Sequence, residues 1–198
     1  MSDRWTVLVL SAGKSTRMGA FKPLLPFGNV TVVERVVITL LAARLSSVSI
    51  VLGYRAEDIK SVLEPYPVET IVNADSDGDM LSSIQCGLRG TSPDSNILVA
   101  LGDQPLIPVS AISQILAVAS VQPDSLIVPV YQTKRGHPIV LPCRYRAEIL
   151  ALAGAGGLRQ LHQRHPDAII EVPVETDAVV LDLDFQQDYR NALQRINA

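Results

Sequence analysis

The chain has 198 residues, of which 47% are hydrophobic and 19% are charged, and its formal net charge is −3. A chain of this length buries roughly 70% of its unfolded surface, enough for one core without disulfide or metal cross-links. The net charge, the lack of long Lys/Arg runs and the shortness of every apolar stretch argue against nucleic-acid and membrane partners, so we expect one cytoplasmic domain over residues 1–198 that binds small molecules.

Short apolar runs rich in Val and Ile predict buried strands in the first part of the chain. These runs cover residues 6–10, 49–52, 70–72, 96–101 and 126–130. Helical spacing of apolar residues predicts helices between them, at residues 32–44, 56–63, 80–89 and 109–119. The first helix opens on a capping-box pattern, Thr31 with Glu34, and Pro108 precedes the fourth. The alternation predicts a three-layer α/β/α fold with a mostly parallel sheet.

The pattern changes after residue 130. A polar loop at residues 131–137 leads into a short apolar run at 138–141 and two helices near 144–153 and 157–165. Two short strands, near residues 168–172 and 179–181, precede a last helix at 187–196. We find no internal repeat and no linker, so we expect this half to build an acceptor pocket on the sheet begun by the first half.

The loop after the first strand carries the strongest functional signal. The small residues 11–13 allow a ligand to approach the backbone, and successive main-chain N–H groups in such a turn form an anion-binding concavity. Arg17 and Lys22 add two cations, which suits the roughly four negative charges of a triphosphate.

Two better-known phosphate motifs do not fit this loop. Gly13, Lys14 and Ser15 resemble the end of a Walker A motif, but the glycine required five residues earlier is replaced by Leu8 inside the strand. The dinucleotide pattern GxGxxG is absent as well. A strand-to-helix turn with incidental positive charge remains the structural alternative.

Acidic residues supply candidate magnesium ligands. Asp103 follows a buried strand through Gly102, and Mg²⁺ needs only one or two carboxylates when phosphate oxygens and water complete its shell. Asp182 and Asp184 alternate with leucines, which predicts a strand with both carboxylates on one face. The alternative is that these two residues belong to the N-terminal region of the last helix.

Taken together, these segments resemble the MocA-like branch, the molybdenum-cofactor cytidylyltransferases, of the MobA-like nucleotidyltransferases. The runs LSAGKSTRMG at residues 10–19 and KPLLP at 22–26 match the family signature LAAGxSxRMGxxKxLLP almost throughout. Residues 73–88 resemble NPxWxxGMSSSLxxGL, and residues 101–106 reproduce LGDQPL. The RGHP at 135–138 resembles the loop before the acceptor-site strand, and residues 181–189 stand where DIDTPEDY lies.

The resemblance implies a fold of the nucleotide-diphospho-sugar transferase type and a Mg²⁺-dependent transfer of CMP from CTP to molybdopterin, with a molybdoenzyme or its chaperone as a protein partner. It assigns catalysis to Arg17, Lys22 and Asp103. It assigns nucleotide binding to Leu10, Ser11, Ala12, Gly13, Lys22, Asn73, Asp75, Ser83 and Asp103. It assigns the acceptor site to Gln104, Pro105, Gly136, His137 and Pro138. It assigns the metal to Asp103 with Asp184 or Asp182.

Several alternatives stay open at this point. Ala12 and the GDQP sequence favour CTP over GTP, whose relatives usually carry LAGG and GDMP. Residues 184–188 depart from DTPED, and the aromatic expected between Asp75 and Gly78 is missing, which leaves room for a sugar-phosphate or alcohol-phosphate acceptor. A non-catalytic nucleotide-binding protein and an oxidoreductase are rival classes. For His137, a loop role without substrate contact is the alternative.

The two cysteines and the remaining histidines predict no further chemistry. Cys86 and Cys143 lack CxxC spacing and are expected to be reduced, half-buried thiols. His162 and His165 sit at a polar helix end, where we do not expect a zinc site.

Overall fold

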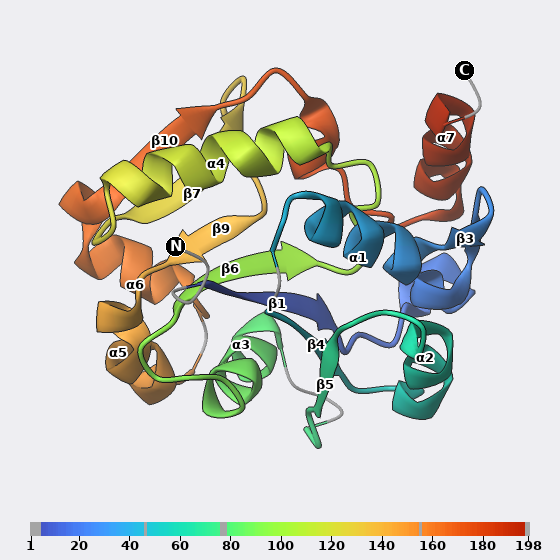
Figure 1. The fold of residues 1–198 in the computed structure, drawn as a ribbon, viewed down its shortest axis with the longest axis horizontal. Coiled ribbons are helices and arrows are strands. Elements are labelled where there is room, and N and C mark those ends of the chain that lie inside the picture. The colour runs from blue at the N-terminus through green and yellow to red at the C-terminus, as the bar shows by residue number, and fades with distance from the viewer. Residues whose placement is uncertain (1–4, 46, 76–78, 155, 197–198) are drawn as a thin grey trace.

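The computed structural model describes residues 5–45, 47–75, 79–154 and 156–196. Gly78 of the matched motif, and residues 76–77 where the family's aromatic is missing, lie outside this part of the chain. Figure 1 shows a central sheet with helices on both sides, which is the expected three-layer α/β/α arrangement. No helix in the described part is long and apolar enough to span a bilayer.

The central sheet runs in the order β10-β7-β9-β6-β1-β4-β5, and β8 pairs with β7. Its strands are β1 (Trp5–Ser11), β4 (Val48–Leu52), β5 (Glu69–Val72), β6 (Asn96–Leu101), β7 (Leu126–Tyr131), β8 (Lys134–Arg135), β9 (Ile139–Leu141) and β10 (Ile169–Pro173). β1 is parallel to β4 and β6, and β10 is parallel to β7. β9 is antiparallel to both β6 and β7, so it joins the two halves of the chain in one sheet.

The alternation of side chains along β1 explains why both faces of the sheet are covered. Val7 and Val9 belong to one core, and Leu8 belongs to the other, because successive strand residues point to opposite faces. The first core packs against α1 (Val32–Ala42), α2 (Ala56–Leu63) and α4 (Val109–Val121). The second packs against α3 (Met80–Arg89), α5 (Arg146–Ala151) and α6 (Arg159–Arg164). Figure 1 shows α1 and α4 on one side of the sheet and α3, α5 and α6 on the other.

Local signals in the sequence place most of these elements. The capping box is formed, because the Thr31 side chain accepts from the backbone of Glu34 and the Glu34 carboxylate accepts from the backbone of Thr31. α1 ends at Ala42, two residues before the predicted end, and Arg44 adopts a left-handed backbone with φ 61°. α4 extends to Val121, beyond the predicted residue 119.

Two expectations change in the structure, and one further element was not predicted. Residues 179–181 do not form a strand: Asp177–Val180 is the 3₁₀ helix η5, and an extended loop follows it. The polar loop at 131–137 contains the short strand β8. A small hairpin of β2 (Pro26–Phe27) and β3 (Val30–Thr31), which the sequence patterns did not reveal, precedes α1.

The last helix, α7 (Gln186–Ile196), packs on this hairpin instead of on the main sheet. A small core joins Phe27 and Val32 to Leu183 and Ala192. Figure 1 accordingly shows α7 beside β3, away from the strands of the sheet. This contact fixes the loop that precedes α7. The loop carries Asp182 and Asp184 and is called the acidic loop below.

Candidate active site

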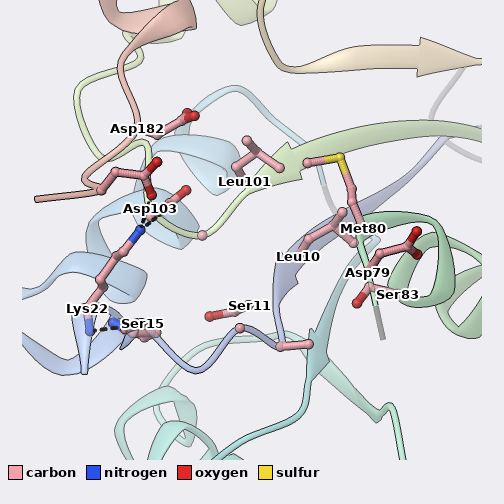
Figure 2. A pocket seen from close by; sticks show the side chains of 15 residues that line it. Leu10, Ser11, Ser15, Lys22, Asp79, Met80, Ser83, Leu101, Asp103 and Asp182 are labelled. Carbon is pink, nitrogen blue, oxygen red and sulfur yellow. Dashed lines mark hydrogen bonds and ion pairs between the residues drawn. The ribbon is translucent and has the colours of Figure 1, made fainter. Parts of the chain in front are cut away.

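A cavity of about 320 Å³ lies where β1 and β6 end, at the carboxyl edge of the sheet. This first cavity is lined by residues of five segments: Leu10, Ser11, Ala12, Gly13 and Ser15; Lys22 and Pro23; Asp79, Met80 and Ser83; Leu101, Gly102 and Asp103; Asp182 and Asp184. Parallel sheets bind ligands at this edge, because their strand-to-helix loops gather there. The loop after the first strand and Asp103 therefore face the same space, as Figure 2 shows.

The loop after β1 folds back on itself through Ser15 and Lys22. Ser15 adopts a left-handed backbone with φ 55°, and its Oγ accepts a hydrogen bond of 3.2 Å from the backbone N–H of Lys22. Gly102 holds the neighbouring strand end close by, since its N–H donates to the carbonyl of Leu10 at 2.9 Å. A Cβ at Gly102 would lie 3.0 Å from the Ser11 side chain. Glycine at 102 therefore brings Asp103 up to the loop.

Four charged side chains form an ionic cluster at one side of the first cavity: Arg17, Lys22, Asp103 and Asp184. The Lys22 ammonium lies 3.0 Å from Asp103 Oδ2 and 2.8 Å from Asp184 Oδ1. Arg17 Nη1 lies 3.1 Å from the other oxygen of Asp184. The Lys22 side chain is only 10% exposed, whereas that of Arg17 is 69% exposed and outside the cavity lining. The two predicted phosphate-binding cations are thus paired with predicted metal ligands.

Asp182 and Asp184 both line the cavity, although the expected strand that was to align them is absent. The Leu183 N–H between them donates to the backbone carbonyl of Asp103 at 3.2 Å, and the Leu183 side chain enters the small core against α7. The side-chain amide of Gln104 donates to Asp182 Oδ1 at 2.8 Å. Asp182 and Asp184 therefore face the cavity because hydrogen bonds and the packing of Leu183 hold the loop in place, and not because they alternate along a strand.

Burial and neighbouring charges shift the pKa values of Asp182, Asp184 and Lys22. The hydrogen bond from Lys22 holds the pKa of Asp184 below its ordinary value. Desolvation, followed by the charge of Asp103, raises the pKa of Asp182. Burial alone would lower the pKa of Lys22, but Asp103 and Asp184 together outweigh burial and raise it. The site therefore favours cations beside Asp103 and Asp184.

The donor set fits a magnesium ion held partly by its substrate. No cluster of three or more His, Cys, Asp or Glu side chains forms a metal cage within the described ranges. Mg²⁺ is commonly bound by one or two carboxylates together with substrate phosphates, and Asp103 with Asp184 supplies that number of groups. One ammonium already bridges these two carboxylates, which shows that they are close enough to share a cation.

The opposite wall of the first cavity is the start of α3. Asp79 caps this helix, accepting from the backbone N–H of Ser82 at 2.9 Å, and Met80 and Ser83 face the cavity. Figure 2 shows Asp79 and Ser83 across the cavity from Lys22 and Asp103.

Asn73 and Asp75 do not line this cavity. The amide of Asn73 donates to Ser82 Oγ at 3.1 Å, and Ser82 in turn donates to Asp75 Oδ2 at 3.1 Å. These two residues support the start of α3, so any influence on a ligand passes through Ser82 and Ser83.

A second cavity of about 760 Å³ adjoins the first and shares Asp79 and Met80 with it. Its other lining residues are Leu81, Val128, Arg135, Gly136, His137, Ile139, Gly156, Gly157, Leu158, Arg159, His162 and Gln163. Desolvation of the His137 ring, partly opposed by Asp103 and reinforced by His162, lowers its pKa to about 4. His137 is therefore neutral at pH 7.

The predicted acceptor residues lie in three places. Gly136 and His137 line the second cavity, and Gln104 and Pro138 line a small apolar cavity beside α1 and α4. Pro105 is buried and lines neither of these cavities. Gln104 instead positions the acidic loop, by donating to Val179 and Asp182.

Several lining residues were not predicted. Ser15 and Asp79 lie inside the matched motifs, so their places in those motifs were an available signal. Arg135 was quoted in the RGHP segment without a role. Arg159 and His162 lie outside the matched motifs, and the packing of α6 brings them to the second cavity.

The two cysteines differ from each other. Both are free thiols, and Cys86 is half-buried as predicted, but Cys143 is exposed.

Comparison with known proteins adds independent findings. The model of the MobA-like NTP transferase domain matches residues 7–169. The nicotine blue oxidoreductase of Paenarthrobacter nicotinovorans is 30% identical over 197 residues, covering 93% of this chain and 95% of that protein. The molybdenum cofactor cytidylyltransferase of Escherichia coli K12 is 25% identical over 191 residues, covering 95% of both. Rv0371c from Mycobacterium tuberculosis H37Rv, solved in complex with manganese, has a TM-score of 0.82 at 25% identity and covers 98% of this chain and 100% of its own.

Proposed function

The chain belongs to the MobA-like NTP transferase family, and from this premise we propose that it transfers CMP from CTP to molybdopterin and releases pyrophosphate. Membership of the family makes it a nucleotidyltransferase. The identities of the nucleotide and of the acceptor are our proposal. One observation supports the proposal most strongly: the loop after β1, Lys22 and Asp103 line a single cavity, and Arg17 pairs with Asp184 of the same lining. A triphosphate needs all three together.

In this proposal the nucleotide lies in the first cavity. Backbone groups of Leu10, Ser11, Ala12 and Gly13 contact it from the loop, and Ser83 contacts it from α3. Arg17 stabilises the leaving pyrophosphate and Lys22 the charge that develops at the α-phosphate. Both roles are electrostatic, so they act through positioned charge and require no covalent enzyme intermediate.

Magnesium would be held by Asp103 and Asp184, with Asp182 as an alternative to Asp184. When bound, the ion neutralises phosphate charge during the transfer. The manganese complex of the similar Rv0371c structure supports a divalent metal in such a fold. Asp103 is the central residue of this assignment, because its backbone also holds the acidic loop through Leu183.

We assign the acceptor to the second cavity. Its volume of about 760 Å³ exceeds what a phosphate alone needs, and Arg135, Arg159 and the rings of His137 and His162 line it. The two cavities share Asp79 and Met80, so the proposal places the acceptor phosphate on the side of the second cavity that faces the nucleotide. Gln104, Pro105 and Pro138 then act from outside the cavity, with Gln104 holding the acidic loop.

The choice of CTP and molybdopterin rests on likeness. Ala12 matches the cytidylyl pattern of the loop, and the cytidylyltransferase of E. coli is similar over nearly its full length. GTP as donor, or a sugar or alcohol phosphate as acceptor, would use the same triphosphate loop and are outcomes of the tests below.

A redox function is the second candidate, because a 30% identical relative is named an oxidoreductase. That reading requires a bound electron carrier or a redox-active substrate. Absorbance spectra of the purified protein, alone and with nicotinamide or flavin cofactors, would reveal such a carrier. A non-catalytic nucleotide-binding protein would bind CTP without releasing pyrophosphate.

A thermal-shift panel of CTP, GTP, ATP and UTP with Mg²⁺ tests the nucleotide assignment. A ligand that binds only the native state at 100 times its Kd stabilises it by about 2.7 kcal/mol. We expect CTP to raise the melting temperature most. Equal shifts for all four nucleotides would contradict the preference for CTP, and no shift with any of them would contradict the function as a whole.

Pyrophosphate release in the presence of molybdopterin tests catalysis. We expect Asp103→Asn to lower turnover by about 10² to 10³, the usual cost of losing one such charge-stabilising group. Cys86→Ala, on α3 but outside the cavity lining, should retain turnover. Equal activity of the two variants would overturn the role of Asp103.

A further inference from the structure

The Lys22 ammonium lies between Asp103 and Asp184, the two carboxylates that the proposed reaction requires as metal ligands. It contacts Asp103 at 3.0 Å and Asp184 at 2.8 Å, and the Lys22 side chain is almost fully covered. Figure 2 shows the ammonium directed to Asp103, on the side of the cavity away from α3. A cation buried between two carboxylates is a specific contact and not an incidental surface pair.

A metal ion and this ammonium cannot occupy the same place. Mg²⁺ binds carboxylate oxygens at about 2.0–2.1 Å, so an ion shared by the two oxygens that Lys22 contacts would overlap the space of its ammonium. Two cations this close repel each other strongly unless added negative charge separates them. The phosphates of a nucleotide are such a charge, and Lys22 reaches the same cavity that they would enter.

We propose that Lys22 is an internal substitute for the metal: it neutralises Asp103 and Asp184 in the free protein and moves to the triphosphate when nucleotide and metal enter together. This inference rests on the proposed function. It makes Lys22 a positioning residue that keeps the two carboxylates together, in addition to its contact with phosphate. Nucleotide and metal binding are then coupled, and each raises the affinity for the other by the same factor.

Binding of Mn²⁺ alone, measured by electron paramagnetic resonance without nucleotide, tests the substitution. We expect weak binding to the wild-type protein and at least tenfold tighter binding to Lys22→Gln. Arg17→Gln is the matched comparison, because it removes one positive charge from the same Asp184 but leaves the bridge between the carboxylates in place. Lys60→Gln removes a lysine from a surface pair with Glu57 and should leave Mn²⁺ affinity unchanged.

The two variants separate a specific bridge from a general charge effect. A gain in Lys22→Gln no larger than that in Arg17→Gln would overturn the proposal. Lys22→Arg, which keeps the charge, should bind Mn²⁺ as weakly as the wild type. Far-ultraviolet circular dichroism establishes that each variant is folded before its affinity is compared.

A measurement on the wild-type chain covers the case in which Lys22→Gln does not fold. The ¹³Cε resonance of Lys22 should shift on addition of CTP with Mg²⁺ and stay in place with Mg²⁺ alone. A shift with Mg²⁺ alone would overturn the coupling. Absence of any effect of CTP with Mg²⁺ on the protein would instead count against the proposed function, so the two failures are distinguishable.

Discussion

Single residues at the ends of β1 and β6 decide where the charges of the site lie. Asp103 reaches the loop after β1 because Gly102 has no side chain: a Cβ at this position would lie 3.0 Å from the Ser11 side chain, closer than ordinary van der Waals contact. The sequence pattern of strand, glycine and aspartate indicated this placement. It could not indicate that Lys22 pairs with Asp103, since 81 residues separate them in the chain.

His137 makes stability depend on pH. Its pKa of about 4 in the folded protein lies below the unfolded value of 6.5, so between these pH values the unfolded chain binds the proton more readily. The contribution of His137 to stability is therefore full above pH 6.5 and declines as the pH falls toward 4. The shift of the His137 pKa from 6.5 to about 4 corresponds to a loss of roughly 3 kcal/mol in the free energy of unfolding below pH 4.

Urea unfolding at several pH values between 7 and 4 measures this effect. As the pH decreases from 7 to 4, we expect the free energy of unfolding to decrease less in His137→Asn than in the wild type. Parallel pH profiles for the two proteins would show that His137 titrates normally in the folded state.

At the scale of elements, the contact between the loop after β8 and η5 governs the acidic loop. The Gly136 N–H donates to Pro129, and the His137 N–H donates to the carbonyl of Val179 at 2.9 Å. That carbonyl also accepts from Gln104, whose amide binds Asp182. A chain of hydrogen bonds thus links the wall of the second cavity to Asp182 in the first.

Gly136→Ala should break this contact. A Cβ at position 136 would lie 2.1 Å from the backbone oxygen of Val179, so the backbone must move. We expect a loss of about 1–3 kcal/mol in the free energy of unfolding, as for other overpacked sites, and weaker stabilisation by CTP with Mg²⁺. Urea unfolding and thermal shift measure the two effects.

Gly90→Ala is the matched control. A Cβ there would meet the Ile71 side chain, with Cδ1 at 2.7 Å and Cγ1 at 3.2 Å, and no backbone atom is among its nearest neighbours. If both glycine variants lose the same stability, the tight contact at Gly136 is not what orders the acidic loop.

At the scale of the whole molecule, β9 makes the sheet continuous. This strand of the second half lies between β6 and β7 of the first half, so both cavities are built on one sheet and two shared cores. We therefore propose that the chain is a single domain, as its composition predicted, because neither half completes a core alone.

Equilibrium unfolding tests the single domain. The one tryptophan, Trp5, reports on β1, and far-ultraviolet circular dichroism reports on all helices. We expect the two signals to follow one coincident transition in urea, as for a cooperative domain. Two separate midpoints would show that the halves unfold independently.

The sequence by itself determined the layers of the fold, the main strands and helices up to residue 130, without the small β2–β3 hairpin, and the loop with its glycine and cations. Local periodicity, capping and turn chemistry act over a few residues and are therefore visible in the sequence. Tertiary structure alone decided the antiparallel insertion of β9, the loop that replaced the expected strand at 179–181 and the pairing of Lys22 with Asp103 and Asp184. These features depend on contacts between distant segments, and the packing of Leu183 against α7, not a repeating pattern, sets the position of both acidic residues.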